Sequence, residues 1–212
     1  MIKRGLVISV WVATLFGQSN LEKGYDYYVL RAEGSIEDRA NPKYLNESIS
    51  YYQLALKEPK SEADAALGLM KSYYYKGKYA VDTEAEKKIV FNKAKQLASI
   101  YINKYPNRFD ILYWYLINLG SWAEVYGIFA AAKEGVADQM KHHAQRIVKM
   151  DPAYEHGGGY FILGVVHYKS PYIPFILSWP DNNDAVKWLE KSVATGKAKP
   201  VQVVYLAQAL YK

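Results

Sequence analysis

The sequence of 212 residues contains no cysteine. Without a thiol the chain forms no disulfide bond, no thiolate metal site and no cysteine nucleophile, and it cannot carry a lipid on an N-terminal cysteine. Its fold must therefore be held by side-chain packing alone. Half of the residues are hydrophobic, which is enough for a packed core and argues against general disorder.

The apolar run near the N-terminus is short. Residues 5–17 are uncharged and mostly apolar, they follow Lys3 and Arg4, and a polar stretch comes next. A spanning helix needs about 20 apolar residues, so this pattern is more typical of a secretory signal peptide. We predict a removable signal at residues 1–19, a single mature domain at residues 20–212 without a stable membrane span, and a periplasmic or otherwise exported location. A buried first helix is the alternative.

The chain also lacks patterned charge. Its formal net charge is +6, but the lysines are scattered among acidic residues and form no basic stripe. A stripe is what a nucleic-acid backbone requires, so we do not expect a nucleic-acid partner.

Motifs for catalysis, metal binding or phosphate binding are missing as well. The sequence has no HExxH, no Gly-x-Ser-x-Gly and no phosphate-loop spacing. His142 and His143 are adjacent, about 100° apart around a helix, and chelate one ion poorly together. Trp179–Asp181 is assigned to local structure, with Asp181 or Asn182 capping the next helix. We predict a non-enzymatic protein without a metal or cofactor.

Three consecutive glycines, Gly157 to Gly159, precede an apolar run. Glycine permits positive φ and close helix approach. We interpret this segment as a tight joint between two helices.

Four segments of helical periodicity each end at or near a proline. Pro59, Pro106, Pro152 and Pro200 stand 47, 46 and 48 residues apart. Counting back from each proline, the same slots recur at offsets of four and three, which keep side chains on one stripe of a helix. The slots hold Ser48, Tyr52 and Ala55; Ala94, Ala98 and Tyr101; Met140, Ala144 and Ile147; and Ala185, Leu189 and Ser192.

A second apolar helix precedes each of these segments. These helices are predicted around residues 22–33, 69–79, 111–120 and 161–169, and residues 201–212 supply a fifth. The segments Leu163–Tyr168 and Tyr74–Tyr79 resemble the first helix and turn of the tetratricopeptide repeat. The resemblance covers residues 22–212 and implies an all-α, right-handed α-solenoid of about four helix hairpins with a C-terminal capping helix.

The period exceeds the usual 34 or so residues. The excess falls between the two helices of each hairpin, at residues 80–90, 121–136 and 170–182. Insertions at one fixed point emerge on one side of a stacked array. The third insertion contains Pro171, Pro174 and Pro180 and should be non-helical.

Aromatic residues are abundant, with 21 tyrosines and 5 tryptophans. Most should be buried between helices, but those in and near the last two insertions could form an apolar wall that receives a ligand or partner. The predicted ligand- or partner-binding residues are Trp114, Tyr115, Trp122, Tyr126, Tyr160, His167, Tyr172, Phe175 and Trp179.

The second half of the chain is similar to the periplasmic T components associated with TRAP transporters. The similar segments are Tyr113–Trp114, Asp151–Gly164, Ser170–Pro171 and Asp184–Val193. This resemblance implies an exported helical protein with a cavity for an apolar ligand, working beside a solute-binding protein. The lipoprotein cysteine expected of an anchored member is absent here.

Two functions remain open. One is an exported scaffold that binds a protein partner on its groove. The other is a T-component-like protein that holds a small apolar ligand. A closed aromatic cavity of about 300 Å³ or more would favour the ligand, and an open face with exposed Tyr and Lys would favour the protein.

Overall fold

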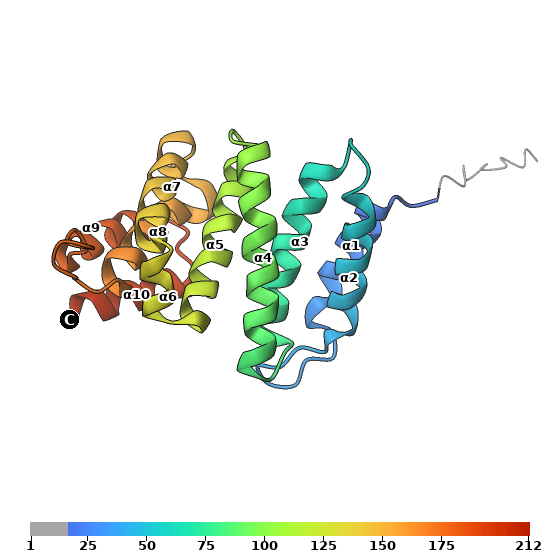
Figure 1. The fold of residues 1–212 in the computed structure, drawn as a ribbon, viewed down its shortest axis with the longest axis horizontal. Helices are drawn as coiled ribbons and strands as arrows, with labels where there is room; N and C mark the ends of the chain where they lie inside the picture. The colour runs from blue at the N-terminus through green and yellow to red at the C-terminus, as the bar shows by residue number, and fades with distance from the viewer. Residues whose placement is uncertain (1–16) are drawn as a thin grey trace, which may run out of the picture.

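The computed structural model describes residues 17–212, so most of the predicted signal peptide, residues 1–16, lies outside it. The described chain consists of helices joined by turns and loops, without a β-strand between residues 17 and 212. The predicted all-α class is therefore confirmed. Figure 1 shows the helices side by side, from α1 and α2 at the right to α8 and α9 at the left.

Helices pair into antiparallel hairpins along the chain. The pairs are α1 with α2, α3 with α4, α5 with α7 and α8 with α9, and α10 packs on α9. The bounds are α1 Asn20–Val29, η1 Leu30–Ala32, α2 Pro42–Ala55, α3 Glu62–Tyr79, α4 Glu84–Lys104, α5 Phe109–Tyr126, α6 Ile128–Lys133, α7 Val136–Met150, α8 Tyr154–Lys169, α9 Asn182–Val193 and α10 Pro200–Leu210.

The two helices of each hairpin have different neighbours. The first helices contact one another in series, α1 with α3, α3 with α5, α5 with α8 and α8 with α10. Across residues 17–212 the backbones of the second helices α2, α4, α7 and α9 do not approach one another as closely as those of the first helices. The first helices therefore share one side of the molecule, which we call the inner side.

The slots identified by counting back from the prolines lie in the core. All of them are buried except Met140, which is half-buried. Tyr52 shows why small residues are needed opposite them. Its ring lies against both Gly24 of α1 and Gly68 of α3, and a Cβ on either glycine would lie within 2.8 Å of the ring. Those glycines let α1 and α3 close around one tyrosine.

The glycines at 157–159 form the joint that the sequence predicts. Glu155, His156 and Gly157 have positive φ, so the chain turns sharply before α8 continues. A Cβ on Gly157 would meet Thr195 and Ser192 of α9, one on Gly158 would meet Tyr113 of α5, and one on Gly159 would meet Val148 of α7. Three helices thus approach three successive glycines.

The insertions differ in form. Residues 80–90 mostly lengthen α4, residues 121–136 lengthen α5 and form α6, and residues 170–181 form a loop without helix. The cap of α9 is as predicted, because the Oδ1 atom of Asp181 accepts a hydrogen bond from the Asp184 N–H at 3.0 Å.

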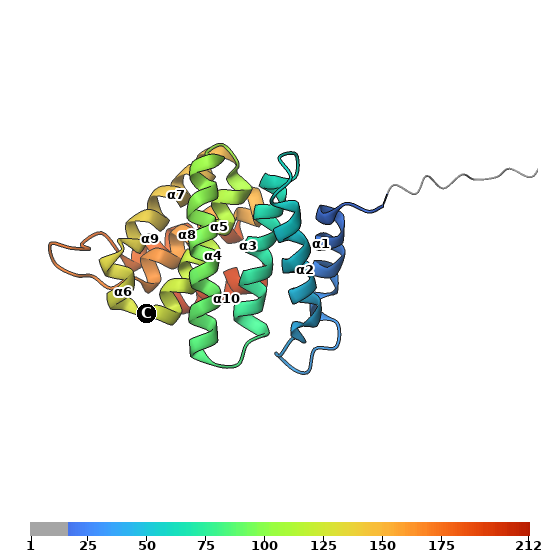
Figure 2. The same ribbon diagram turned by 45° about the vertical axis from the view of Figure 1, so that its right-hand side comes forward.

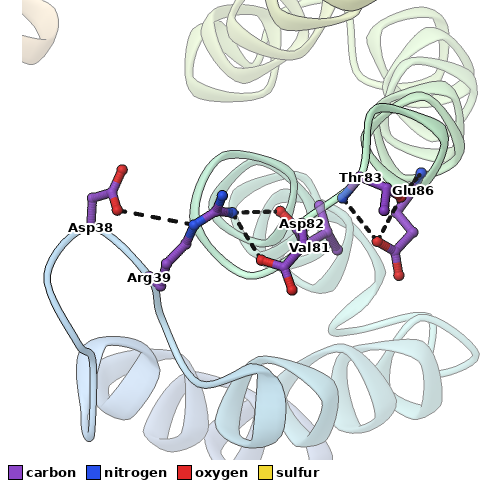
Figure 3. A network of polar contacts seen from close by, with 6 residues as sticks. All are labelled: Asp38, Arg39, Val81, Asp82, Thr83 and Glu86. Atoms are coloured by element: carbon purple, nitrogen blue, oxygen red, sulfur yellow. Dashed lines mark hydrogen bonds and ion pairs between the residues drawn. The ribbon is translucent and has the colours of Figure 1, made fainter.

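The first two hairpin turns meet at one end of the molecule. Arg39, in the turn between η1 and α2, donates to the Val81 carbonyl at 3.0 Å and pairs with Asp82 at 3.1 Å (Figure 3). The Ala40 N–H donates to the Tyr79 carbonyl at 2.7 Å. Figure 2 shows these two turns together at the bottom of the view. The turns of the first two hairpins thus emerge on the same side.

Candidate functional site

A pocket lies between the second and third insertions. Its volume is about 350 Å³, it is partly open to solvent, and α5, α6, α7, α8 and the loop 170–181 all contribute to it. Small and aliphatic side chains line most of it. They include Gly120, Ala123, Gly127, Ile128, Ala131, Ala132, Gly135, Val136, Met140, Val165, Val166, Ile176 and Leu177. Polar groups at its edge are Glu124, Asp138 and Lys169.

The loop 170–181 closes one side of this pocket and is fastened to α7 by Trp179. The indole N–H of Trp179 donates to the Asp138 carboxylate at 2.7 Å, and the Lys141 ammonium lies 4.1 Å from its ring centroid. His167 packs against the same ring at 4.9 Å. The position of Ile176 and Leu177 over the pocket therefore depends on Trp179.

His167 has a structural setting. It is 5% exposed, and its Nδ1 atom accepts the backbone N–H of Asp181 at 3.2 Å. Burial lowers the pKa of the His167 imidazole, against the opposing charge of Asp184. A neutral imidazole with Nδ1 as acceptor links α8 to the start of α9.

None of the nine predicted binding residues lines the pocket. Trp122 is 3% exposed and stacks on Tyr126 at 4.6 Å, beneath the Lys95 ammonium at 3.7 Å from the Trp122 centroid. Tyr115 is buried, and its hydroxyl donates to Gln139 at 2.6 Å. These aromatic residues fasten α5 to α4 and α7.

Of the other predicted aromatic residues, Tyr160 contacts a neighbouring helix, and Tyr172 and Phe175 lie in the loop 170–181. Tyr160 stacks on Trp188 of α9 at 6.0 Å between centroids. Tyr172 is mostly exposed, and Phe175 is fully exposed with a φ of 64°. A non-glycine residue held at positive φ stores strain, and such strain clusters at functional positions.

Trp114 alone among the nine belongs to the inner side. It is half-buried, its ring meets Tyr74 edge-on at 5.7 Å, and the Lys71 ammonium lies 5.6 Å from its centroid. Beside it, the Arg31 guanidinium lies over Tyr28 at 4.3 Å and Tyr75 at 5.1 Å. We call Tyr28, Arg31, Lys71, Tyr74, Tyr75 and Trp114 the inner aromatic surface.

The inner aromatic surface borders a groove between α1 and α3. This groove has a volume of about 620 Å³ and includes Tyr25, Tyr28, Leu67 and Lys71. Burial raises the pKa of the Tyr28 hydroxyl, with Arg31 opposing the shift, and burial lowers the pKa of the Lys71 ammonium. Both side chains are therefore partly withdrawn from water.

Tyr28, Arg31 and Lys71 are functional candidates that were not predicted from the sequence. A signal for Lys71 was available, because Leu67, Lys71, Tyr74 and Tyr75 recur at helical spacing opposite the buried face of α3. Arg31 offers no such pattern, since it lies in the short helix η1. For the pocket, the glycines at 120, 127 and 135 are a weak signal of open space between helices.

Within residues 17–212, no group of three or more His, Asp or Glu side chains is placed to hold a metal ion. In the same part of the chain, no helix has both the length and the apolar character required to span a membrane.

The family model described as regulator of microtubule dynamics protein 1-3 matches residues 36–176, which is more than half of the chain. The chain belongs to this family. The matched range runs from the turn before α2 to the loop after α8, so it includes the pocket region and most of the inner aromatic surface. No curated protein matches the chain.

Proposed function

We propose that this chain is a non-enzymatic helical-repeat scaffold that binds a protein partner on its inner side. In this proposal the hairpins form a tetratricopeptide-like, right-handed α-solenoid with α10 as its cap. The serial contacts between first helices support this arrangement, because stacked hairpins place equivalent helices next to one another.

The inner aromatic surface is the observation that carries the proposal. It combines half-buried Tyr and Trp rings with Arg and Lys side chains on α1, η1, α3 and α5. Tyr, Trp and Arg are the residues that contribute most to binding energy at protein interfaces. Tyr44 and Tyr51 of α2 also have lysines over their rings and stack on Tyr27, but this set joins only α1 and α2, whereas the inner aromatic surface extends over three hairpins.

The family description supports a protein as the kind of partner. Its description names regulators of microtubule dynamics, and a microtubule is a protein polymer. For this chain a microtubule is one candidate partner. The predicted export signal favours instead a partner outside the cytosol. Identification of the partner decides between a microtubule and an exported partner.

Site-specific photo-crosslinking tests the proposal. A photoreactive phenylalanine replaces Tyr75 on the inner side, and in a matched control it replaces Lys187, which is exposed on α9. We expect a defined partner, identified by mass spectrometry, to crosslink at position 75 and to be lost when Trp114→Ala is added. Equal crosslinking at both positions, or none at position 75, would contradict the proposal. Co-sedimentation of the purified protein with microtubules tests that partner directly.

The second candidate is a T-component-like protein that holds a small apolar ligand beside a TRAP-type transporter. It is favoured by the pocket of about 350 Å³, which lies within the size range of ligand sites and is lined mainly by aliphatic atoms. Native mass spectrometry of protein from its own host should then show a bound small molecule. Ala131→Trp should abolish that extra mass while crosslinking at position 75 persists.

A further inference from the structure

Two cations of the inner aromatic surface lack a carboxylate partner. Neither Arg31 nor Lys71 forms an ion pair within residues 17–212, whereas nearby Lys78 pairs with Glu124 at 2.7 Å. Partly buried cations without a partner are costly, because they lose hydration and gain no compensating charge.

Arg31 is held in place, but not all of its N–H donors have a hydrogen-bond acceptor. Its Nη1 atom donates to the Tyr28 carbonyl at 3.0 Å, and the guanidinium lies between the rings of Tyr28 and Tyr75. Its Nε atom is buried and has no hydrogen-bond partner in the described chain. A guanidinium has five N–H donors, so this one retains donors for a planar oxyanion.

Lys71 lines the groove between α1 and α3 together with Tyr28. Its ammonium lies over Trp114, and the charges of Glu155 and Asp110 reach it only from a distance, as weaker influences than its burial. Both carboxylates are engaged elsewhere, Glu155 with Lys199 and Asp110 with Arg108. The ammonium therefore remains available to an incoming anion.

The acidic side chains of the groove also have partners. Glu22 accepts from Ser19, Asp26 accepts from Gln18, and Asp64 pairs with Arg108 at 2.9 Å. Ser19 and Gln18 are neutral donors and do not compensate the charges of Glu22 and Asp26, but within residues 17–212 none of these three carboxylates forms an ion pair with Arg31 or Lys71. The charged side chains of the inner aromatic surface itself, Arg31 and Lys71, are both positive.

We propose that the inner aromatic surface binds an acidic segment of a protein partner, with Arg31 and Lys71 each receiving a carboxylate. Tyr28, Tyr74 and Trp114 pack against the segment between these two charges. The proposal rests on the protein-binding function above and specifies the chemistry of the partner. Charge-assisted hydrogen bonds to a carboxylate are stronger than neutral ones, and a guanidinium makes two of them in parallel.

Fluorescence anisotropy with two labelled peptides tests this inference. In one peptide glutamates alternate with tyrosines, and in the other each glutamate is replaced by glutamine. We expect the acidic peptide to bind at least about tenfold more tightly, and Arg31→Gln and Lys71→Gln each to weaken it by about tenfold. Arg31→Lys should recover only part of the loss, because lysine lacks the bidentate fork.

Lys187→Gln is the matched control. It removes the same charge from an exposed site on α9 and should leave peptide affinity unchanged. Circular dichroism and thermal melting establish that each variant is folded. Equal affinity for both peptides, or equal weakening by Lys187→Gln, would overturn the inference. So would tighter binding of RNA or of anionic phospholipid vesicles that is lost in the same Arg31 and Lys71 variants.

The two proposals fail in different ways. If position 75 crosslinks a defined partner but the acidic peptide neither binds nor competes, the scaffold function stands and the acidic-segment inference is wrong. If no partner crosslinks at position 75, the scaffold function is wrong, whatever the peptide does.

Discussion

Trp114 and Trp122 lie two turns apart on α5 and have different environments. Trp122 is 3% exposed, is covered by Lys95 and stacks on Tyr126. Trp114 is half-buried on the inner aromatic surface, beside Lys71 and Tyr74. Each has a lysine over its ring and an indole N–H without a hydrogen-bond partner in the described chain. Both are tryptophans on one helix, but Trp122 is enclosed in the core, whereas Trp114 packs against the core and stays partly exposed.

This difference shows that the neighbouring helices decide whether an aromatic ring on α5 is enclosed or stays partly exposed. Toward the hairpin turns, α4 and α5 are long enough to enclose Trp122 between them. Near the start of α5, Trp114 meets Tyr74 and Lys71 of α3 and keeps part of its side chain exposed. The enclosed ring contributes mainly to stability, and the partly exposed ring is available for recognition.

The largest effect is expected for Trp122→Ala. Removing a buried indole should lower the free energy of unfolding by about 3 kcal/mol or more, because the lysine and tyrosine around it lose their contacts. Chemical denaturation measures this loss, and Trp122→Phe should recover much of it. A loss below about 1 kcal/mol would show that the site is not core and would remove the contrast with Trp114.

Trp114→Ala should have a smaller effect on folding. We expect a loss of about 1 kcal/mol, since the ring is only half-buried. The crosslink at position 75 and the binding of the acidic peptide should both fall sharply. If unfolding is affected as strongly as in Trp122→Ala while binding is retained, Trp114 is a core residue and the comparison breaks down.

The packing of His143 on α7 against Tyr115 on α5 can be tested through the dependence of stability on pH. His143 packs against Tyr115 at 5.6 Å, and burial, with the charges of His142 and Arg146, lowers the pKa of its imidazole to about 4 from 6.5. The unfolded chain therefore binds more protons between these values. The stability contributed by neutral His143 is present above about pH 6.5 and is lost as pH falls toward 4.

Melting temperature as a function of pH measures this effect. We expect the protein to lose stability between pH 6.5 and 4, and His143→Gln should make that decline shallower. His142→Gln removes the exposed neighbouring imidazole and should change the decline less than His143→Gln, because burial is the main cause of the lowered pKa of His143. Identical pH profiles for His143→Gln and the unaltered protein would show that His143 is not held neutral by the fold.

The smallest effect is expected for Phe175→Gly. Phe175 is fully exposed at positive φ, so glycine relieves backbone strain and removes no buried contact. The free energy of unfolding should change by less than about 1 kcal/mol. A large loss would show that the loop tip packs against the domain, which would place Phe175 with Trp122 rather than with the exposed aromatic residues.

Much of the helical framework follows from the sequence. Counting back from Pro106, Ala94, Ala98 and Tyr101 are spaced by four and three residues, which predicted that they share one helical face, and all three are buried. The three glycines at 157–159 identified a joint, because no side chain fits where helices approach that closely. The export signal remains a prediction, since residues 1–16 lie outside the described structure.

The pocket and the inner aromatic surface could be predicted from the sequence only in part. The sequence indicated that the last two insertions share an apolar wall, and both do line one pocket. Its lining of alanine, glycine and aliphatic residues was not predicted. No sequence pattern indicates where empty volume remains between helices, whereas aromatic residues can be identified directly. Arg31 and Lys71 both lie near Tyr28 although they are 40 positions apart in the chain, and no local pattern connects them.

The sequence by itself determined the all-α class, the approximate positions of the paired helices and the face that the second helix of each pair buries, because these depend on periodicity within a few turns. Only the tertiary structure decided which aromatic rings are enclosed, where space remains between insertions, and which cations lack a carboxylate. Those properties depend on how neighbouring hairpins cover one another, and that covering is set by contacts between residues distant along the chain.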